Sequence, residues 1–318
     1  MVQKLKTWAA SRGRLAVLSA TELFESRRFI TGLRENGLLK SRVYRNYLAG
    51  LVKPSLGLEA KFKSIIMLSI ARPAHALTFE CESGLFSCFI PPTYVGNNQL
   101  RSTLLKDLRN FMGWDFPKIS ILRAPIKRLA VRSGLAVYGR NNITYSGEYG
   151  SYHQLLGFAC EAELEPFCAG EQTENPRLPA CIRCSACIRR CPTEAIDQNR
   201  FLIHAEKCFT LFTETPGCLP PVRNKLIGEM LCLVGCLSCQ TVCPANRGRL
   251  KIEQAPVSFT AAETRHFLAD NSMRNGSDRR LDPVWQGIRT KLKILGMLQY
   301  QNRIGRNLRF IMNIGKSK

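Results

Sequence analysis

Eight of the fourteen cysteines have a spacing that suits iron–sulfur chemistry: seven fall into two short runs, and one lies between the runs. The first run has cysteines at positions 181, 184, 187 and 191, and the second has them at 236, 239 and 243. A proline follows each run, and Cys208 lies between the two. Thiolates two residues apart can wrap a loop and a helical turn around one cube of iron and sulfide, and the proline then stops the helix. The runs therefore predict two 4Fe–4S clusters and a redox protein that moves electrons singly.

The first run resembles the C-x2-C-x2-C-x3-C-P pattern of bacterial two-cluster ferredoxins, in which the fourth cysteine of a run ligates the other cluster. This resemblance divides the thiolates into two sets. The first set is Cys181, Cys184, Cys187 and Cys243, and the second is Cys191, Cys208, Cys236 and Cys239.

Zinc and disulfides are the alternative uses of these cysteines. Zinc is commonly held by paired C-x2-C units, which fit two overlapping triplets less well. Disulfides are disfavoured because no secretory segment is visible. Cys232 lies four residues before Cys236 and is left out of the ligand set, and the other cysteines are interpreted as buried apolar thiols.

The chain has 318 residues and a formal net charge of +22, which favours acidic partners such as an acidic electron donor or a nucleic acid. No apolar run reaches the roughly 18 residues that span a bilayer. We expect no transmembrane segment and a place in the reducing cytoplasm, which also suits oxygen-sensitive clusters.

The pattern of apolar residues predicts an α/β (α+β) fold with three parts: an α/β domain over 1–170, a ferredoxin-like domain over 171–250, and a basic helical extension over 251–318. In the first part we expect strands at 15–18, 64–68 and 119–122. We expect helices ending near Ser11, starting at a Ser19–Glu22 capping box, and covering 99–112 and 125–133. Leu202 and Ile203 are predicted to form a strand of a small hairpin.

From Arg274 onward the sequence has eleven Lys or Arg residues against two acids. Its apolar residues follow helical spacing, which predicts two basic amphipathic helices packed on the protein's own surface. The alternative is a surface for nucleic acid or a membrane.

A second constellation follows the predicted helix at 125–133. The segment 134–142 reads Gly-Leu-Ala-Val-Tyr-Gly-Arg-Asn-Asn, and Gly150-Ser151 follows it. Glycine lets the backbone turn sharply and approach a ligand closely. Together with the cysteine runs, this segment resembles the epoxyqueuosine reductases, over roughly residues 60–250. Those proteins combine an L-A-x-R-x-G-L-G-x-x-G-K-N segment, a G-S motif and a cluster run ending G-C-x-x-C-Q-x-x-C-P.

The resemblance implies an N-terminal cobalamin-binding domain whose cobalt receives electrons from the clusters. By position, the corrin site would be lined by Tyr138, Gly139, Arg140, Asn141 and Ser151. Arg140 stands where the family usually has lysine, so a charged contact persists with a different geometry. Larger family members carry a helical-repeat tail that helps hold tRNA, which we expect to be absent.

The sequence also departs from the family at its proton donor. The family has an aspartate about ten residues before the L-A pair, whereas this position is Ser120 and no carboxylate occurs between Lys118 and Ala136. Tyr138 and His153 are the replacements considered, although a histidine in this setting is more often a structural residue.

Three functions are compatible with these patterns. The first is a corrinoid-dependent reductase with an unknown substrate, fed by a reduced ferredoxin- or flavodoxin-type donor. The second is an electron-transfer or corrinoid-reactivating protein without substrate chemistry. The third is a cluster-based redox sensor or nucleic-acid-binding protein, which rests on the charge and the basic C-terminal residues alone.

Overall fold

The computed structural model describes residues 1–53, 61–170, 177–220, 222, 230–269 and 282–316. Its contacts divide the chain into two compact units. The first unit contains residues 1–71, 99–185 and 198–206, and the second contains 72–98, 186–197 and 207–318. Each unit is described by itself.

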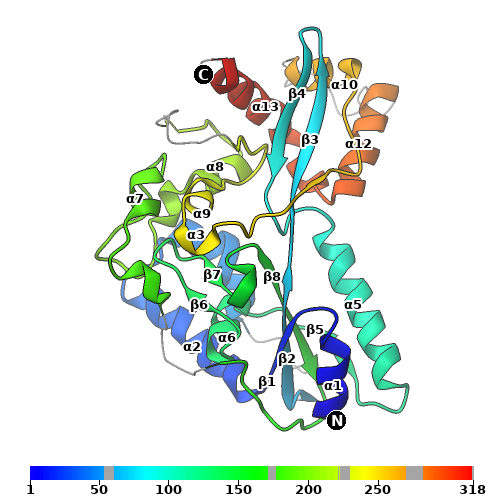
Figure 1. Ribbon diagram of the computed structural model, residues 1–318, viewed down its shortest axis with the longest axis vertical. Coiled ribbons are helices and arrows are strands. Elements are labelled where there is room, and N and C mark those ends of the chain that lie inside the picture. Colours follow the sequence, from blue (N-terminus) through cyan, green and yellow to red (C-terminus); the bar gives the residue numbers. More distant parts are fainter. Residues whose placement is uncertain (54–60, 171–176, 221, 223–229, 270–281, 317–318) are drawn as a thin grey trace. The chain divides into compact units, whose positions relative to one another are not determined.

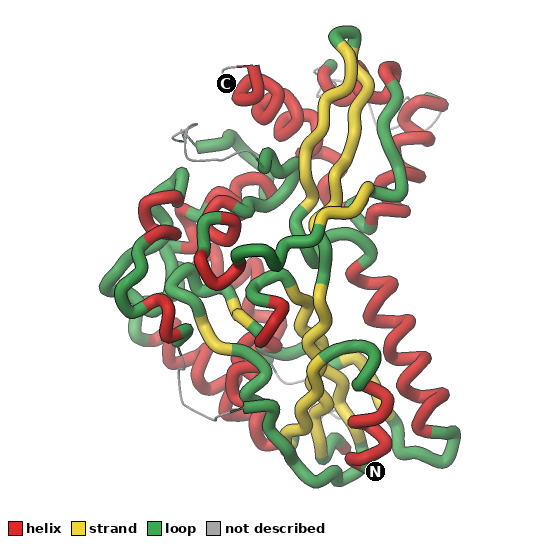
Figure 2. Tube along the Cα trace, viewed as in Figure 1, coloured by secondary structure: helices red, strands yellow, loops and turns green. Residues whose placement is uncertain are grey.

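A four-stranded antiparallel sheet forms the centre of the first unit (Figures 1 and 2). Its order is β1 (Arg14–Ser19), β2 (Ser64–Ala71), β8 (His153–Cys160) and β5 (Ile119–Ile121). The two central strands are almost wholly buried, because helices cover both faces of the sheet. Their continuous apolar sequences reflect this double burial.

Alternate residues of the strands feed two separate cores. Leu15 and Val17 pack with α1 (Val2–Ala9) and α5 (Asn97–Met112). Ala16 and Leu18 point the other way and pack with α2 (Thr21–Glu35) and α6 (Ile126–Arg132). This two-residue alternation is the expected geometry of a strand, and it makes the first unit a helix–sheet–helix sandwich.

Shorter elements complete the first unit. Helix α3 (Ser41–Val43), a π-helix (Tyr44–Leu48) and α4 (Ala49–Val52) follow α2. The two-stranded ribbon is β6 (Val137–Tyr138) with β7 (Thr144–Tyr145), and 3-10 turns lie at Gly147–Tyr149, Pro179–Cys181 and Ala205–Lys207, the last of which ends in the second unit.

The second unit contains a three-stranded sheet of order β4 (Gly84–Ile90), β3 (Ala74–Cys81) and β9 (Ile252–Gln254). Figure 1 shows the long β3–β4 hairpin beside α10 (Ala261–Leu268) and α12 (Pro283–Leu295). The remaining elements are α7 (Ala186–Arg190), α8 (Phe209–Glu214), α9 (Ser238–Thr241), α13 (Gln301–Lys316) and 3-10 turns at Pro244–Asn246 and Leu298–Tyr300.

The predicted strands at 15–18, 64–68 and 119–122 are confirmed, as are the N-terminal helix and the helices at 99–112 and 125–133. The capping box is wrong: Ala20 is the N-cap of α2, and the Ser19 hydroxyl instead accepts from the backbone N–H of Thr21. The strand at Leu202 and Ile203 is also wrong, since these residues form bends and coil. The β3–β4 hairpin was not predicted.

The C-terminal helices pack on the second unit's own core, as the sequence favoured. Ile288, Leu292 and Leu308 are fully buried there with Leu77 and Phe79 of the hairpin. The predicted domain boundaries near 170 and 250 remain a prediction. The two compact units have other boundaries, because residues 251–269 and 282–316 share a core with residues 72–98.

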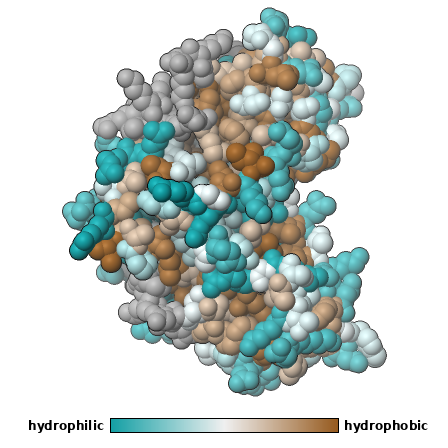
Figure 3. Space-filling model, viewed as in Figure 1, coloured by the Kyte–Doolittle hydropathy of each residue, from teal (hydrophilic) through white to brown (hydrophobic). Residues whose placement is uncertain are grey.

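Large exposed apolar side chains are few and scattered, including Trp114, Leu85 and Ile182. Figure 3 accordingly shows hydrophilic and hydrophobic areas interspersed on the visible face. Among the described residues, no helix has the length and apolar character that crossing a membrane requires.

Candidate functional site

The four cysteines of the second predicted cluster all lie in the second unit. Cys208 directly precedes α8, Cys236 directly follows Gly235, and Cys239 lies in α9. Gly235 has φ +80°, and a Cβ there would lie 2.8 Å from the Tyr94 hydroxyl. The turn into the second cysteine run therefore requires glycine.

Burial and neighbouring thiols raise the pKa values of Cys208, Cys236 and Cys239. The pKa of Cys208 is raised to about 11, chiefly by burial and then by Cys236 and Cys191. Burial raises the pKa of Cys239 well above its usual value, and Cys236, Cys208, Cys187 and Cys191 raise it further. Neighbouring buried thiols whose thiolate forms are disfavoured fit a cluster, whose iron supplies the compensating positive charge.

Backbone hydrogen bonds to sulfur are also present. The N–H of Ala195 lies 3.2 Å from the Sγ of Cys191, and the Cys236 thiol lies 3.4 Å from the Ser238 hydroxyl. Such bonds to the thiolates are one of the means by which proteins tune cluster potentials.

Within the described residues, no three His, Cys, Asp or Glu side chains converge on the position of a single metal ion.

The first predicted set is divided between the units: Cys181 and Cys184 belong to the first, and Cys187 and Cys243 to the second. Its assembly into one cluster remains a prediction. The loop that carries the first two ligands is held by Arg140. The Arg140 side chain donates to the carbonyl oxygens of Cys181, Cys184 at 3.1 Å and Gln198 at 3.1 Å.

The segment from Tyr138 to Asn142 is a tight turn between β6 and β7. A Cβ on Gly139 would lie 2.4 Å from the Tyr145 ring and 2.6 Å from the Asn141 side-chain oxygen. Asn141 is buried. Its side-chain nitrogen donates to the Tyr145 hydroxyl at 3.1 Å, and its side-chain oxygen accepts from the Ile143 N–H at 3.2 Å. The Arg140 and Asn141 side chains therefore build the turn, while their predicted contacts with a corrin remain untested.

His153 lies buried at the start of β8. Its Nε2 is 3.0 Å from the carbonyl oxygen of Thr144, which can only accept, so Nε2 carries the proton. Its Nδ1 then accepts from the Ser69 hydroxyl at 2.9 Å. Burial lowers the pKa of His153 to about 4. A neutral, doubly hydrogen-bonded imidazole fits the structural role that the sequence favoured over catalysis.

A cavity of about 510 Å³ lies in the first unit beside this turn. Tyr138 and Asn142 line it, together with residues of α2, the π-helix, α4 and α6 and the segment after Phe201. Among the described residues that line it there is no Asp or Glu. Burial raises the pKa of Tyr138 to about 12, so the phenol keeps its proton at neutral pH. Of the five predicted corrin-site residues, Tyr138 lines this cavity. Ser151, which follows β7 in the sequence, is buried.

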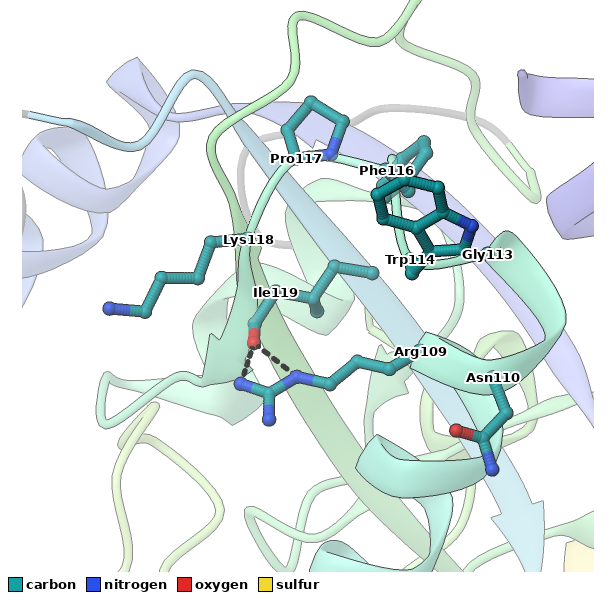
Figure 4. Close-up of a pocket in the computed structure, with 8 residues that line it drawn as sticks. All are labelled: Arg109, Asn110, Gly113, Trp114, Phe116, Pro117, Lys118 and Ile119. Atoms are coloured by element: carbon teal, nitrogen blue, oxygen red, sulfur yellow. Dashed lines mark hydrogen bonds between the residues drawn. The ribbon is translucent and has the colours of Figure 1, made fainter.

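A second hollow of about 550 Å³ lies at the end of α5 (Figure 4). Trp114 stands at its edge with 94% of its surface exposed. Figure 4 shows the Arg109 guanidinium directed at the carbonyl oxygen of Ile119, to which it donates two hydrogen bonds. The main cation of this hollow is thus engaged in joining α5 to β5, and no predicted site residue lines it.

Some residues that line the cavity beside the β6–β7 turn could not be identified as site residues from the sequence. Arg101 and the π-helix residue Tyr47 lie far from either motif in the chain, and only the fold brings them to the cavity. Arg123 lies in the segment whose lack of carboxylates was noted, but its place in a cavity wall could not be inferred from that.

Comparisons with known proteins agree with this geometry. Residues 180–246 match the family described as a 4Fe-4S double cluster binding domain, which identifies two 4Fe–4S clusters as the cofactors of this region. The chain is 34% identical over 122 residues to epoxyqueuosine reductase from Staphylococcus aureus, covering 38% of this chain and 30% of that protein. It is 33% identical over 123 residues to the Bacillus subtilis protein, covering 39% and 29%. The matched region thus spans less than a third of each relative.

Solved structures extend the similarity to the fold. The epoxyqueuosine reductase from Bacillus subtilis aligns with a TM-score of 0.68 at 23% identity, covering 99% of this chain and 82% of that one. The enzyme from Streptococcus thermophilus aligns with a TM-score of 0.67 at 19% identity, covering 99% and 81%. The mixed α/β fold is therefore shared with these structures.

Proposed function

We propose that this chain is an iron–sulfur reductase of the epoxyqueuosine reductase type, which passes electrons through two 4Fe–4S clusters to a corrinoid beside residues 138–151. The double-cluster match supports the electron path, and the sequence and fold comparisons support a reductase over a carrier or a sensor. Because this chain lacks the aspartate that serves as the family's proton donor, we propose that its substrate differs from that of the relatives.

The observation that carries this proposal is the position of Arg140. Its side chain binds the loop of Cys181 and Cys184, while the adjacent turn residues Tyr138 and Asn142 line the cavity. One short segment therefore connects the loop of two predicted first-cluster ligands to the cavity. Electron transfer requires such proximity and a fixed geometry between donor and acceptor.

The chemical types of the residues in this segment are compatible with a bound corrinoid. Tyr138 offers an aromatic ring to the cavity, and the lack of a side chain on Gly139 makes room for the Tyr145 ring and the Asn141 side chain in the turn. Among the described residues that line the cavity there is no histidine or cysteine. A bound corrinoid would supply a metal centre that accepts single electrons and reduces the substrate. The cavity itself has the size of a site for one small organic molecule, and we assign it to the substrate.

Tyr138 is the proposed proton donor. It lines the cavity, and its raised pKa keeps the hydroxyl protonated at neutral pH. The hydroxyl can therefore donate a hydrogen bond to a substrate atom that gains electrons, and deliver the proton as negative charge develops there. His153 has both ring nitrogens engaged inside the sheet and is given no part in this step.

A reduced ferredoxin- or flavodoxin-type protein is the proposed electron donor. Such donors are acidic, and the net charge of +22 would accelerate their encounter with this chain. We place the reaction in the cytoplasm, where reducing conditions preserve the clusters and thiols.

The test is an anaerobic titration of cluster-loaded protein with cob(II)alamin, followed by electron paramagnetic resonance. The proposal predicts saturation at one equivalent with a spectrum that lacks an axial nitrogen ligand, alongside about eight irons per chain. About eight irons with an unchanged cob(II)alamin spectrum would refute the corrinoid and favour an electron-transfer protein. A Gly139→Val variant is the matched control, because its side chain would obstruct the turn without touching any cysteine.

A further inference from the structure

The cavity of the first unit has one predominantly apolar wall. Helix α2, the π-helix and α4 supply aliphatic and aromatic side chains to it. Four aromatic rings take part in the lining: Phe29, Tyr47, Tyr138 and Phe201. The rings of Tyr138 and Phe201 meet edge to face with centroids 5.2 Å apart, and Phe29 meets Phe201 in the same way at 6.4 Å. Such a wall suits a planar apolar body.

Another part of the lining is cationic. Arg101 comes from α5, Arg123 follows β5, and Lys127 and Arg128 come from α6. Four cations thus line one cavity, and no carboxylate accompanies them among the lining residues that the structure describes. Cations gathered without acids repel one another, so the arrangement is most favourable when an anion is present.

The four cations differ in their engagement. The Arg128 guanidinium lies 4.0 Å from the centre of the Phe29 ring, and Lys127 donates to the carbonyl oxygen of Asn142 at 2.7 Å. Both side chains are thereby held as part of the wall. Arg123, by contrast, is exposed to solvent. Its guanidinium is accessible to a ligand without the loss of a recorded contact.

Among the four cations, Arg101 gives the strongest indication of an anion-binding site. Its Nε atom is buried and has no hydrogen-bond partner within the described part of the chain. Burial lowers the pKa of Arg101, and the charge of Arg123 lowers it further, which places the two guanidinium groups close enough to interact. A buried donor without an acceptor is unfavourable, and an anionic ligand between the two arginines would remove that penalty.

We propose that this cavity binds a planar organic anion whose carboxylate or phosphate pairs with Arg101 and Arg123 while its ring packs against the aromatic wall. This inference deepens the proposed function by naming the substrate class. The binding of the anion does not depend on the proposed function. Only the statement that the bound anion is the molecule reduced rests on that function.

The experiment is calorimetric titration of the full-length, cluster-loaded protein under anaerobic conditions without an electron donor. The probes are naphthalene-2-carboxylate, 2-naphthyl phosphate and the neutral isostere naphthalene-2-carboxamide. We expect at least one anion to bind about tenfold or more tightly than the amide, because a charge-assisted pair with a guanidinium is worth about 1.5–3 kcal/mol. The tighter of the two anions identifies the acidic group.

Variants locate the site. Arg101→Gln and Arg123→Gln should each weaken the anion about tenfold and leave amide binding unchanged. Lys106→Gln is the matched control, because Lys106 is an exposed cation on the same helix as Arg101 that does not line the cavity. Arg123→Glu, on an exposed position that tolerates substitution, should abolish anion binding while circular dichroism reports an intact fold.

Two results would overturn the inference. One is binding of the amide as tightly as both anions, or no binding of either anion at millimolar concentration. The other is an equal effect of Lys106→Gln and Arg123→Gln, which would indicate a general response to net charge. Because no electron is transferred, these outcomes are separate from the cob(II)alamin titration: anion binding without cobalamin binding refutes the proposed function alone, and the reverse refutes the substrate class alone.

Discussion

The backbone N–H of Arg140 lies 3.4 Å from the Sγ atom of Cys181, and the Arg140 side chain donates to the Cys181 carbonyl oxygen. The same guanidinium reaches the Cys184 carbonyl oxygen at 3.1 Å. A residue that the family resemblance assigned to corrin contact is therefore engaged with the loop of the first cluster. Its planar fork bonds several carbonyls at once, which a lysine in its place could not do in the same geometry.

Replacement of Arg140 by Ala should weaken the hold on the first pair of cluster ligands. Three carbonyl contacts are lost, so the loop of Cys181 and Cys184 becomes less ordered and its cluster more accessible to chelators. We expect iron release from about half of the total iron to accelerate severalfold, while the rest is released at the wild-type rate. Iron release to a chelator, followed by absorbance, measures both phases.

The control for this variant is Arg183→Ala, which removes an exposed arginine from the same loop. Equal acceleration in both variants would contradict the role given to Arg140.

Replacement of Gly139 by Ala should destabilise the first unit. The new methyl group would lie 2.4 Å from the Tyr145 ring and 2.6 Å from the Asn141 oxygen, so buried groups must shift. Overpacking of this kind typically costs about 1–3 kcal/mol. A lowered midpoint in thermal denaturation, followed by circular dichroism, measures it. Gly32→Ala in the interior of α2 meets nothing within 4 Å and should raise the midpoint slightly; a fall of the same size in both variants would count against the steric account.

His153 should make the stability of the fold depend on pH in one window. Its native pKa of about 4 lies below its ordinary value of 6.5, because burial disfavours the charged ring. The unfolded chain therefore binds the proton first, and stability that is fully present above pH 6.5 is lost as the pH falls toward 4, by about 3 kcal/mol in total. Urea denaturation between pH 7 and 4 measures the slope.

His153→Gln should flatten this slope, since glutamine does not titrate. The control is His204→Gln, on a partly exposed histidine outside the sheet. An unchanged slope in His153→Gln would show that another group is responsible. Retained turnover in this variant would agree with the absence of His153 from the proton-transfer step.

Asn307 joins the C-terminal helix to the segments that lead into the second cluster. Its buried amide donates to the carbonyl oxygens of Thr213 at 2.9 Å and Leu233 at 3.0 Å. Asn307→Leu leaves both carbonyls without this donor, at a cost of about 2–4 kcal/mol. We expect a lower unfolding midpoint and slower cluster reconstitution. Asn302→Leu, on an exposed position of the same helix, should leave both unchanged; a matching loss there would indicate a general effect of leucine on α13.

The sequence predicted those features that rest on local spacing. The cysteine runs identified the clusters because their ligands lie close together along the chain, and helical spacing located Ile288 and Leu292 on a buried face. The β3–β4 hairpin was missed because its strands are half-buried and contain polar residues at several positions, so their alternation is weak.

The cavity could not be predicted, because it is assembled from residues far apart in the sequence. Arg101, Arg123 and Phe201 reach one wall only after the sheet and its helices have formed. The same holds for Arg140, whose partners lie about forty residues away and were not suggested by its own motif.

The most direct test of the central claim is to follow electrons from the clusters to cobalamin in a single turnover. Protein with both clusters photoreduced is mixed anaerobically with one equivalent of cob(II)alamin, and freeze-quenched samples are examined by electron paramagnetic resonance. The account predicts that the cob(II)alamin signal and about half of the reduced-cluster signal decay at the same rate, because one cob(II)alamin accepts one of the two stored electrons. It also predicts that Cys239→Ala, which removes a predicted second-cluster ligand, slows this decay strongly. Reduced clusters that persist beside an unchanged cob(II)alamin signal would contradict the account.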